Sequence, residues 1–483
     1  MTKAAPNDGT PLGHLSDAEL VKEFARELAR RRLGAGGLEL DAIESFASDV
    51  QRSLGDETLG AVIAGLPPED GSPKACPRCK QLVPVKVKNR PRHVLTVAGE
   101  LRVSRNYHHC ERCNAGFYPR DAELKLPEEG EVSDAMERRI LDFGINDTFE
   151  SVAERWSIHY PTRISSNLVR RVVERAGLRC EAAYSEEWQQ QVCVAKPEEP
   201  APMLVVATDG SMLHTREASW KEAKVGVVAR GDKVAAAMRK QGIEGARYVG
   251  VLGGQSEFKK SLAAALAVER ADEVPCIVWL GDGARENWTL ASELAPFAVQ
   301  VLDVPHAVHW AMACGKSLLG EGDAGLPLWE ARIHALLDAD SPAAAIRELL
   351  ECLEWANTAE QLAALDDVIG YYRTNEKRMR YRTFRAMGLP VGSGIVESAH
   401  RHVLQVRMKR AGMRWGMAQA RRMVRLRALY RTAGAQRFHR ALSDALVGPP
   451  ARSNHKPLPN GPRRANRGYT LGRGSRLNRA ASK

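Results

Sequence analysis

Three short apolar runs constrain the fold of this chain more than any other feature of its sequence. They are separated by helical patterns, and each is followed within two residues by an aspartate: Met203–Thr208, Cys276–Leu280 and Val299–Leu302. Continuous apolar runs of this length are typical of strands buried on both faces, which alternate with helices in α/β folds. Two further β-rich segments, Lys224–Val228 and Arg247–Leu252, predict an antiparallel extension. The pattern therefore predicts an α/β layer built on a mixed sheet.

Acidic side chains follow these strands. Asp209 and Asp282 each precede a glycine, and Glu397 follows a Gly-Ser-Gly turn at the start of a predicted helix. Sites form at the carboxyl ends of strands in open α/β sheets. Carboxylates gathered there repel one another unless divalent cations such as Mg²⁺ or Mn²⁺ neutralise them. Two such ions about 3.5–4 Å apart can activate a nucleophile and stabilise the leaving oxygen in phosphoryl transfer, although a single Asp-Gly pair is more often simply a turn.

Four of the nine cysteines form two Cys-x-x-Cys pairs, separated by about thirty residues that include two β-rich runs: Cys76, Cys79, Cys110 and Cys113. Two such pairs on successive turns bring four thiolates together, which is the ligand set of a structural Zn²⁺ site. The alternatives are four unrelated thiols or a redox pair. A ribbon this small depends on its metal to fold. We therefore expect a zinc ribbon at residues 71–120 with a structural Zn²⁺.

The other segments differ in their patterns. Residues 1–70 read as a helical N-terminal region, and residues 131–196 are helical again. We expect the α/β domain to span residues 200–446, with a purely helical insertion at about 321–385. The basic tail at 447–483 has almost no large apolar side chains, so we expect it to be disordered.

Two helical patterns within residues 131–196 are separated by a short turn. The second pattern carries Arg170 and Arg171 on a helix that follows the turn at residues 159–161. This arrangement is consistent with a helix-turn-helix that reads DNA. A helical hairpin with solvated arginines is an equally good interpretation.

Positive charge is concentrated at the C-terminal end of the chain. The net charge is +11, but residues 1–397 contain 49 Lys and Arg against 58 Asp and Glu, whereas residues 398–483 contain 21 against one. Such a block is typical of a surface that binds a polyanion. Residues 398–440 interleave these cations with apolar positions at helical spacing, so we expect the apolar side to pack and the cations to face DNA phosphates. The candidate contacts nearest the predicted acidic site are Arg401, Arg407, Lys409, Arg410 and Arg414.

A membrane is the other polyanionic surface to consider. The first ten residues lack the apolar core of a signal peptide, and no apolar run approaches the roughly 18–20 residues of a transmembrane helix. We therefore expect a cytoplasmic, nucleoid-associated protein with no membrane partner.

Four motifs together resemble the DDE transposases of bacterial insertion sequences, specifically the ISKra group. They are Thr208–Ser211, Leu280–Gly283, Gly388–Ser398 and Arg407–Trp415, within a resemblance that covers about residues 70 to 435. The resemblance implies an RNase H-like catalytic core in which Asp209, Asp282 and Glu397 bind the metal ions. Asp303 and His306 resemble the D-x-x-H signature of the related Mutator-type enzymes. With Trp415, which closes the last motif, they are candidate accessory residues, and the alternative for Asp303 is a helix cap.

The sequence thus predicts a multidomain α+β DNA transposase with a zinc ribbon, a helical DNA-binding region and an RNase H-like core. It would cleave at insertion-sequence ends and join them to target DNA, acting as a homo-oligomer because two ends are coupled. The alternatives are a non-catalytic DNA-binding regulator that keeps the zinc ribbon and the helix-turn-helix, and an RNase H-like nuclease that cuts without joining.

Overall fold

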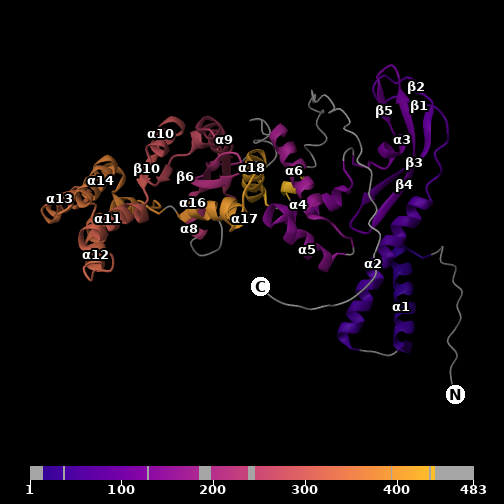
Figure 1. Cartoon of the computed structure of the whole chain (residues 1–483), viewed down its shortest axis with the longest axis horizontal. Helices are drawn as coiled ribbons and strands as arrows, with labels where there is room; N and C mark the ends of the chain where they lie inside the picture. The colour runs from indigo at the N-terminus through magenta and orange to yellow at the C-terminus, as the bar shows by residue number, and fades with distance from the viewer. Residues whose placement is uncertain are drawn as a thin grey trace, which may run out of the picture.

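The computed structural model describes residues 15–35, 39–127, 130–160, 162–183, 197–237, 245–392, 394–434 and 437–440 of the 483. The predicted tail at 447–483 lies outside these residues. Figure 1 shows the described parts arranged along the longest axis, from the N-terminal helices at one end to the helices of residues 304–375 at the other. Within the described ranges, no helix has both the length and the apolar character needed to cross a membrane.

The N-terminal helices α1 (Asp17–Ala35) and α2 (Leu40–Ala64) lie side by side (Figure 1). Ser16 and Glu19 cap α1 reciprocally: the Ser16 N–H donates to Glu19 Oε2 at 2.9 Å, and the Glu19 N–H donates to Ser16 Oγ at 3.4 Å. The end of α2 packs on the cysteine-containing sheet through apolar side chains from both: Leu59, Ile63, Val94, Leu101 and Val103.

Antiparallel strands, two of them 11 residues long, form the cysteine-containing ribbon. They are β1 (Lys74–Ala75), β2 (Leu82–Val83), β3 (Val85–Leu95), β4 (Glu100–Cys110) and β5 (Ala115–Phe117). β1 pairs with β2, and β3, β4 and β5 form a second sheet in that order. The two β-rich runs between the cysteine pairs are therefore present as the antiparallel strands β3 and β4.

A helical segment links the ribbon to the large sheet. It contains α3 (Pro119–Glu123), α4 (Asp134–Asn146), α5 (Phe149–His159) and α6 (Ser166–Ala183). Hydroxyl caps start three of these helices, because Ser133 Oγ accepts from the Met136 N–H, Thr148 Oγ1 from the Ser151 N–H and Ser165 Oγ from the Leu168 N–H. Trp156 on α5 is buried in the core that α4 and α6 share with the rest of the chain.

The large sheet contains the three apolar runs as neighbouring or next-neighbouring strands. Its strands are β6 (Leu204–Thr215), β7 (Ser219–Arg230), β8 (Arg247–Leu252), β9 (Ile277–Gly281) and β10 (Val299–Leu302). The order is β10-β9-β6-β7-β8, with β9 parallel to both β10 and β6, and with β7 antiparallel to both β6 and β8. This is the strand arrangement of the expected RNase H-like core, and with the helices and the cysteine cluster it confirms the predicted multidomain α+β class.

Helices surround this sheet and continue beyond its last strand. They are α8 (Gly231–Ala237), α9 (Gln255–Val268), α10 (Arg285–Leu294), α11 (Val304–Leu319), α12 (Leu326–Asp338), α13 (Pro342–Glu351), α14 (Ala359–Asn375) and α15 (Tyr381–Ala386), with short 3₁₀ turns at Ala271–Glu273, Cys352–Trp355 and Glu376–Arg378. The helices from α11 to α14 gather away from the sheet (Figure 1). The chain then returns to the sheet with α16.

The C-terminal helices bring the chain back across the sheet. α16 (Gly394–His400) packs on β6 and β7 and continues through a π-helical turn (Arg401–Gln405) into α17 (Val406–Met408). α18 (Met417–Ala433) then lies between β8 and α6, so it joins the α/β core to the helical segment (Figure 1).

The structure corrects the expectation that the cations of this basic segment face solvent or phosphates. Arg407, Arg425 and Arg427 are buried, with 1%, 9% and 3% of their surface exposed. Arg427 donates to the backbone carbonyls of His402, Val403 and Ile145. Because these carbonyls belong to the π-helical turn and to α4, the guanidinium ties three elements together instead of binding DNA.

Candidate functional site

The strand register places the predicted aspartates next to one another. Ala207 of β6 pairs with Leu280 of β9, so Asp209 and Asp282 stand at matching positions two residues further along adjacent parallel strands. Leu302 of β10 pairs with Gly281, and Asp303 therefore follows beside Asp282. Neighbouring strands are about 4.8 Å apart. The three aspartates thus form a row at the carboxyl ends of β9 and β10. Asp209 itself lies inside β6, which continues to Thr215, and not at a strand end as the sequence predicted.

Asn287 on α10 holds the central aspartate. Its Nδ2 donates to Asp282 Oδ1 at 2.7 Å, and the Ala284 N–H donates to the same oxygen at 3.0 Å. Asn287 also accepts from Thr208 Oγ1 at 2.7 Å, beside Asp209. Because Thr208 and Asn287 are buried, this network fixes the Asp282 carboxylate through its Oδ1.

Helix α16 brings Glu397 to the same edge of the sheet. His400 of this helix is 3% exposed, and its Nε2 lies 3.3 Å from Asp209 Oδ2. Glu397 is one helical turn earlier on the same face and is exposed. Burial lowers the pKa of His400, so a neutral imidazole lies against Asp209.

Asp303 and His306 form a carboxylate–imidazole pair beside these acids. Asp303 is fully buried, and its Oδ2 lies 2.5 Å from His306 Nδ1 and accepts the His306 N–H at 3.2 Å. Asp303 therefore caps α11, as the alternative interpretation held, and also orients the imidazole. The pKa of His306 is raised, first by the hydrogen bond to Asp303 and then by the charges of Asp303, Asp282 and Asp209.

Tyr371 on α14 contacts the same region from the helical segment before Glu397. Its hydroxyl donates to the Asp282 carbonyl at 2.7 Å. Burial raises the pKa of this phenol. Neither Tyr371 nor Asn287 nor His400 emerged from the sequence patterns. For His400 alone the sequence offers a signal: it lies three residues after Glu397 on a predicted helix, and so on the same helix face.

The four predicted zinc ligands form a compact cluster. The Sγ atoms of Cys76, Cys79, Cys110 and Cys113 all lie within 4.8 Å of one another. Among the described residues, no other set of three or more His, Cys, Asp or Glu side chains comes as close together. The carboxylates of Asp209, Asp282 and Glu397 do not come that close as a set.

The geometry of the cysteine cluster fits a tetrahedral metal site. Zn–S bonds of about 2.3 Å place tetrahedral sulfurs roughly 3.8 Å apart, and the Cys79 and Cys110 sulfurs are 3.6 Å apart. The residue after each pair, Lys80 and Asn114, has a positive φ of 64° and 47°, which curls each pair around its thiols. Backbone N–H groups of Cys79 and Arg78 lower the pKa of Cys76 to about 7. The cluster can therefore bind a metal such as zinc.

Most of the predicted DNA contacts are exposed, and one is not. Arg401, Lys409, Arg410 and Arg414 are exposed. Lys409 Nζ donates to Ser211 Oγ at 2.7 Å, two residues beyond Asp209, and Arg410 pairs with Asp147 at 2.7 Å. Arg407 is buried between aromatic rings, which removes it from the outer surface expected to face a duplex.

The arginines of the predicted helix-turn-helix engage neighbouring acids. Arg170 pairs with Glu174 at 2.9 Å and Arg171 pairs with Glu131 at 3.1 Å. Their side chains stay 45% and 52% exposed. Surface pairs of this kind contribute little to stability and exchange readily for a phosphate.

The fold and these two sites define a multidomain α/β protein with an RNase H-like sheet, an acidic edge and a four-cysteine ribbon. The chain belongs to the uncharacterised protein family UPF0236, whose model matches residues 75–442. That match spans the ribbon, the helical segment, the sheet and the C-terminal helices.

Comparisons with curated proteins and with solved structures do not narrow the class of protein further. No curated protein matches the chain. Among solved structures, the Drosophila P element transposase strand transfer complex is similar to it with 11% sequence identity and a TM-score of 0.23, over 68% of this chain and 82% of that chain. A TM-score this low carries no argument about function.

Proposed function

We propose that this protein is a DNA transposase that cleaves DNA at the ends of an insertion sequence and joins those ends to target DNA. The observation that carries the proposal is the row of acids: Asp209 and Asp282 stand in register on adjacent parallel strands, and Glu397 is one turn from the histidine that touches Asp209. The motif resemblance to DDE transposases supports the same three residues as the catalytic acids.

The donor set at the acidic edge fits Mg²⁺ or Mn²⁺. All three proposed ligands are carboxylates, which these hard cations prefer, and Asn287 engages Asp282 Oδ1. When bound, the ions supply activation of the attacking oxygen and stabilisation of the leaving oxygen in phosphoryl transfer. The nucleophile would be water in cleavage and the freed 3′-hydroxyl in joining.

The residues around the acids act by positioning. Asn287 keeps the Asp282 carboxylate in one orientation, and His400 packs against Asp209 as a neutral ring. Asp303 aims His306 at the same edge. A site with its oxygens held before substrate arrives loses less free energy to reorganisation during the reaction.

DNA would lie across the exposed cations of the C-terminal segment. Arg401, Lys409, Arg410 and Arg414 are exposed in the segment that follows α16, the helix of Glu397. Arg170 and Arg171 add partly exposed cations on α6. We propose that the zinc ribbon is structural and that the protein acts as a homo-oligomer, because joining couples two DNA ends.

The test uses the full-length zinc-loaded protein and a supercoiled plasmid that carries the gene with its genomic flanks. Wild-type protein with Mg²⁺ is expected to cut at the element ends and to yield joined products. Asp209→Asn is expected to abolish cutting while the plasmid is still bound, since the substitution removes a ligand charge and little volume.

The matched control is Asp272→Asn, the same chemical change at an exposed acid between α9 and β9. It is expected to cut as the wild type does. Cutting by Asp209→Asn at the wild-type rate would refute the assignment of the site. Cutting without joined product would identify a nuclease, and binding without any cutting by the wild type would identify a regulator.

A further inference from the structure

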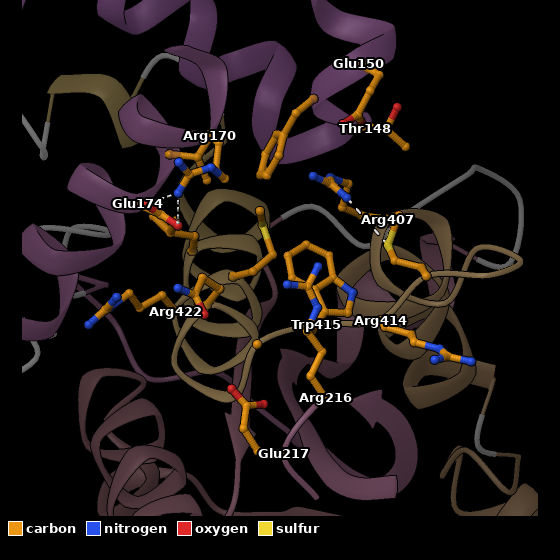
Figure 2. A pocket seen from close by; sticks show the side chains of 17 residues that line it. Thr148, Glu150, Arg170, Glu174, Arg216, Glu217, Arg407, Arg414, Trp415 and Arg422 are labelled. Atoms are coloured by element: carbon orange, nitrogen blue, oxygen red, sulfur yellow. Dashed lines mark hydrogen bonds and ion pairs between the residues drawn. The ribbon is translucent and has the colours of Figure 1, made fainter. Parts of the chain in front are cut away.

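A second site lies away from the acidic edge, where the helical segment meets the α/β core. It is a cavity of about 660 Å³ between α5, α6, the β6–β7 turn and the chain from α17 to α18 (Figure 2). Its walls contain five arginines, gathered around Trp415 in Figure 2: Arg170, Arg216, Arg407, Arg414 and Arg422.

The cavity carries excess positive charge. Three glutamates line it against the five arginines. Arg170 pairs with Glu174 and Arg422 pairs with Glu181. Arg216, Arg407 and Arg414 form no ion pair with any residue that the structure describes. The guanidinium groups of Arg216 and Arg414, which are exposed, are therefore available to an anion from outside the chain.

Arg407 is the least expected of these cations. It is 1% exposed, and its guanidinium carbon lies 4.9 Å from the Phe149 ring centre and 5.1 Å from that of Trp415. Its Nε donates to the Gly144 carbonyl at 3.4 Å. Burial lowers its pKa to about 10. The charges of Asp147 and Glu150 act on this guanidinium without forming an ion pair with it. Burying a charge is costly, and an anionic ligand in this cavity would offset more of that cost.

The side chains inside the cavity are of the kinds on which a flat aromatic ring of a ligand can stack. Phe149, Trp415, Met413 and Met423 contribute aromatic and thioether surface to its walls. Aromatic rings and guanidinium planes are the surfaces on which nucleobases stack. Arginine also offers paired donors to base edges.

The cavity is connected to the acidic edge along one strand. Asp209 and Thr215 are both on β6, and Thr215 bridges to Trp415, whose carbonyl accepts from the Arg216 N–H at 2.9 Å. Six residues of strand span roughly 20 Å. Lys409, bound to Ser211, stands between the two sites. A DNA strand held at the acids can therefore reach the cavity by passing Lys409.

We propose that this cavity binds one unpaired nucleotide of the DNA strand, with its phosphate on Arg216 and Arg414 and its base against Phe149, Arg407 and Trp415. The inference rests on the proposed function for the identity of the polymer. A duplex keeps its bases stacked inside and cannot fill the cavity without flipping one out. The chain's own tail after residue 450 is basic, so it is repelled by the same arginines.

The experiment compares two fluorescein-labelled probes by anisotropy: a blunt duplex of arbitrary sequence, and the same duplex with a short single-stranded extension. Full-length wild-type protein is expected to bind the extended probe about tenfold more tightly, because the unpaired base gains a stacking contact that the blunt duplex lacks. Arg216→Gln is expected to lose most of that preference. Arg52→Gln, the same loss of charge on the distant helix α2, is expected to keep it.

A second measurement tests whether a variant loses its preference for the extended probe through misfolding instead of through loss of the contact. With 2-aminopurine as the unpaired base, wild-type protein is expected to quench its fluorescence on binding, and Phe149→Leu is expected to quench it less. Circular dichroism and melting curves accompany each variant.

Different experimental outcomes would refute the nucleotide pocket and the catalytic assignment. Asp209→Asn is expected to keep the preference for the extended probe while losing cleavage. Equal affinity of wild type for both probes, or an unchanged preference in a folded Arg216→Gln protein, overturns the nucleotide pocket and leaves the acidic site untouched. A wild type that prefers the extended probe and never cuts keeps the pocket and overturns the proposed function.

Discussion

Asn287 offers the most direct test of how the acidic edge is held. Its Nδ2 donates to Asp282 Oδ1 and its Oδ1 accepts from Thr208, both at 2.7 Å. Asn287→Leu keeps a side chain of similar shape and removes both bonds. The substitution therefore separates the polar network from simple packing.

The magnitude follows from burial. Thr208 is 2% exposed, so its hydroxyl loses a partner where water cannot replace it, at a cost of about 1–3 kcal/mol. Asp282 is only half-buried, and its carboxylate recovers part of its hydration, so we assign it about 1 kcal/mol. The total is about 2–4 kcal/mol. For a domain of this size, that lowers the melting temperature by roughly 4–16 °C.

Activity should fall as well. A misdirected Asp282 carboxylate is expected to slow Mg²⁺-dependent plasmid cleavage about 10–100-fold, the usual effect of losing a partner that orients a metal ligand. Melting is followed by circular dichroism and cleavage on agarose gels. Thr289→Ala is the control on the same helix, because the Thr289 hydroxyl donates only along α10 to the Arg285 carbonyl at 3.1 Å and is exposed. An Asn287→Leu protein that melts within about 1 °C of wild type and cuts equally fast would refute the reasoning.

Four further predictions follow from individual side chains. Chelation of zinc, or Cys113→Ser, should make the ribbon sensitive to limited proteolysis, and metal analysis should show the loss of about one zinc per chain. A ribbon that resists proteolysis after chelation and in Cys113→Ser would contradict a structural metal. The pKa of His306 is raised by Asp303, so its protonated form stabilises the fold below about pH 6.5. This contribution is lost as the pH rises through the pKa of His306 in the folded protein. In urea unfolding, His306→Gln should therefore be more destabilising at about pH 5.5 than at about pH 9. Arg427→Met should lower the free energy of unfolding by about 2–4 kcal/mol, measured in urea, without altering the salt dependence of DNA binding. Arg401→Ala should reduce the slope of log Kd against log salt by about one with an unchanged melting temperature, and an unchanged slope would exclude a phosphate contact there.

Local patterns in the sequence were sufficient for the elements and for part of the site. Apolar runs predicted β6, β9 and β10, and the aspartates after them were recognisable as site candidates. The four cysteines were predicted as one cluster because their spacing is itself the geometric signal. In both cases the information lies in short motifs of the chain.

The basic C-terminal segment shows where such patterns fail. Alternating cations and apolar residues predicted an arginine-covered outer face, yet Arg407, Arg425 and Arg427 are buried. Their burial depends on α18 passing between β8 and α6 and on carbonyls offered by α4 and the π-helical turn. A single-helix pattern contains no information about which neighbours cover both of its sides.

The sequence by itself predicted the three apolar runs as strands, grouped the four cysteines into one cluster and showed where positive charge accumulates. These features follow from side-chain periodicity, ligand spacing and composition. Only the tertiary structure decided that β9 lies between β6 and β10, which sets Asp209, Asp282 and Asp303 in one row. It also decided that Asn287, His400 and Tyr371 support that row, and that Arg407 faces a cavity instead of the outer surface. The physical reason is that strand order and burial are set by contacts between residues far apart in the chain.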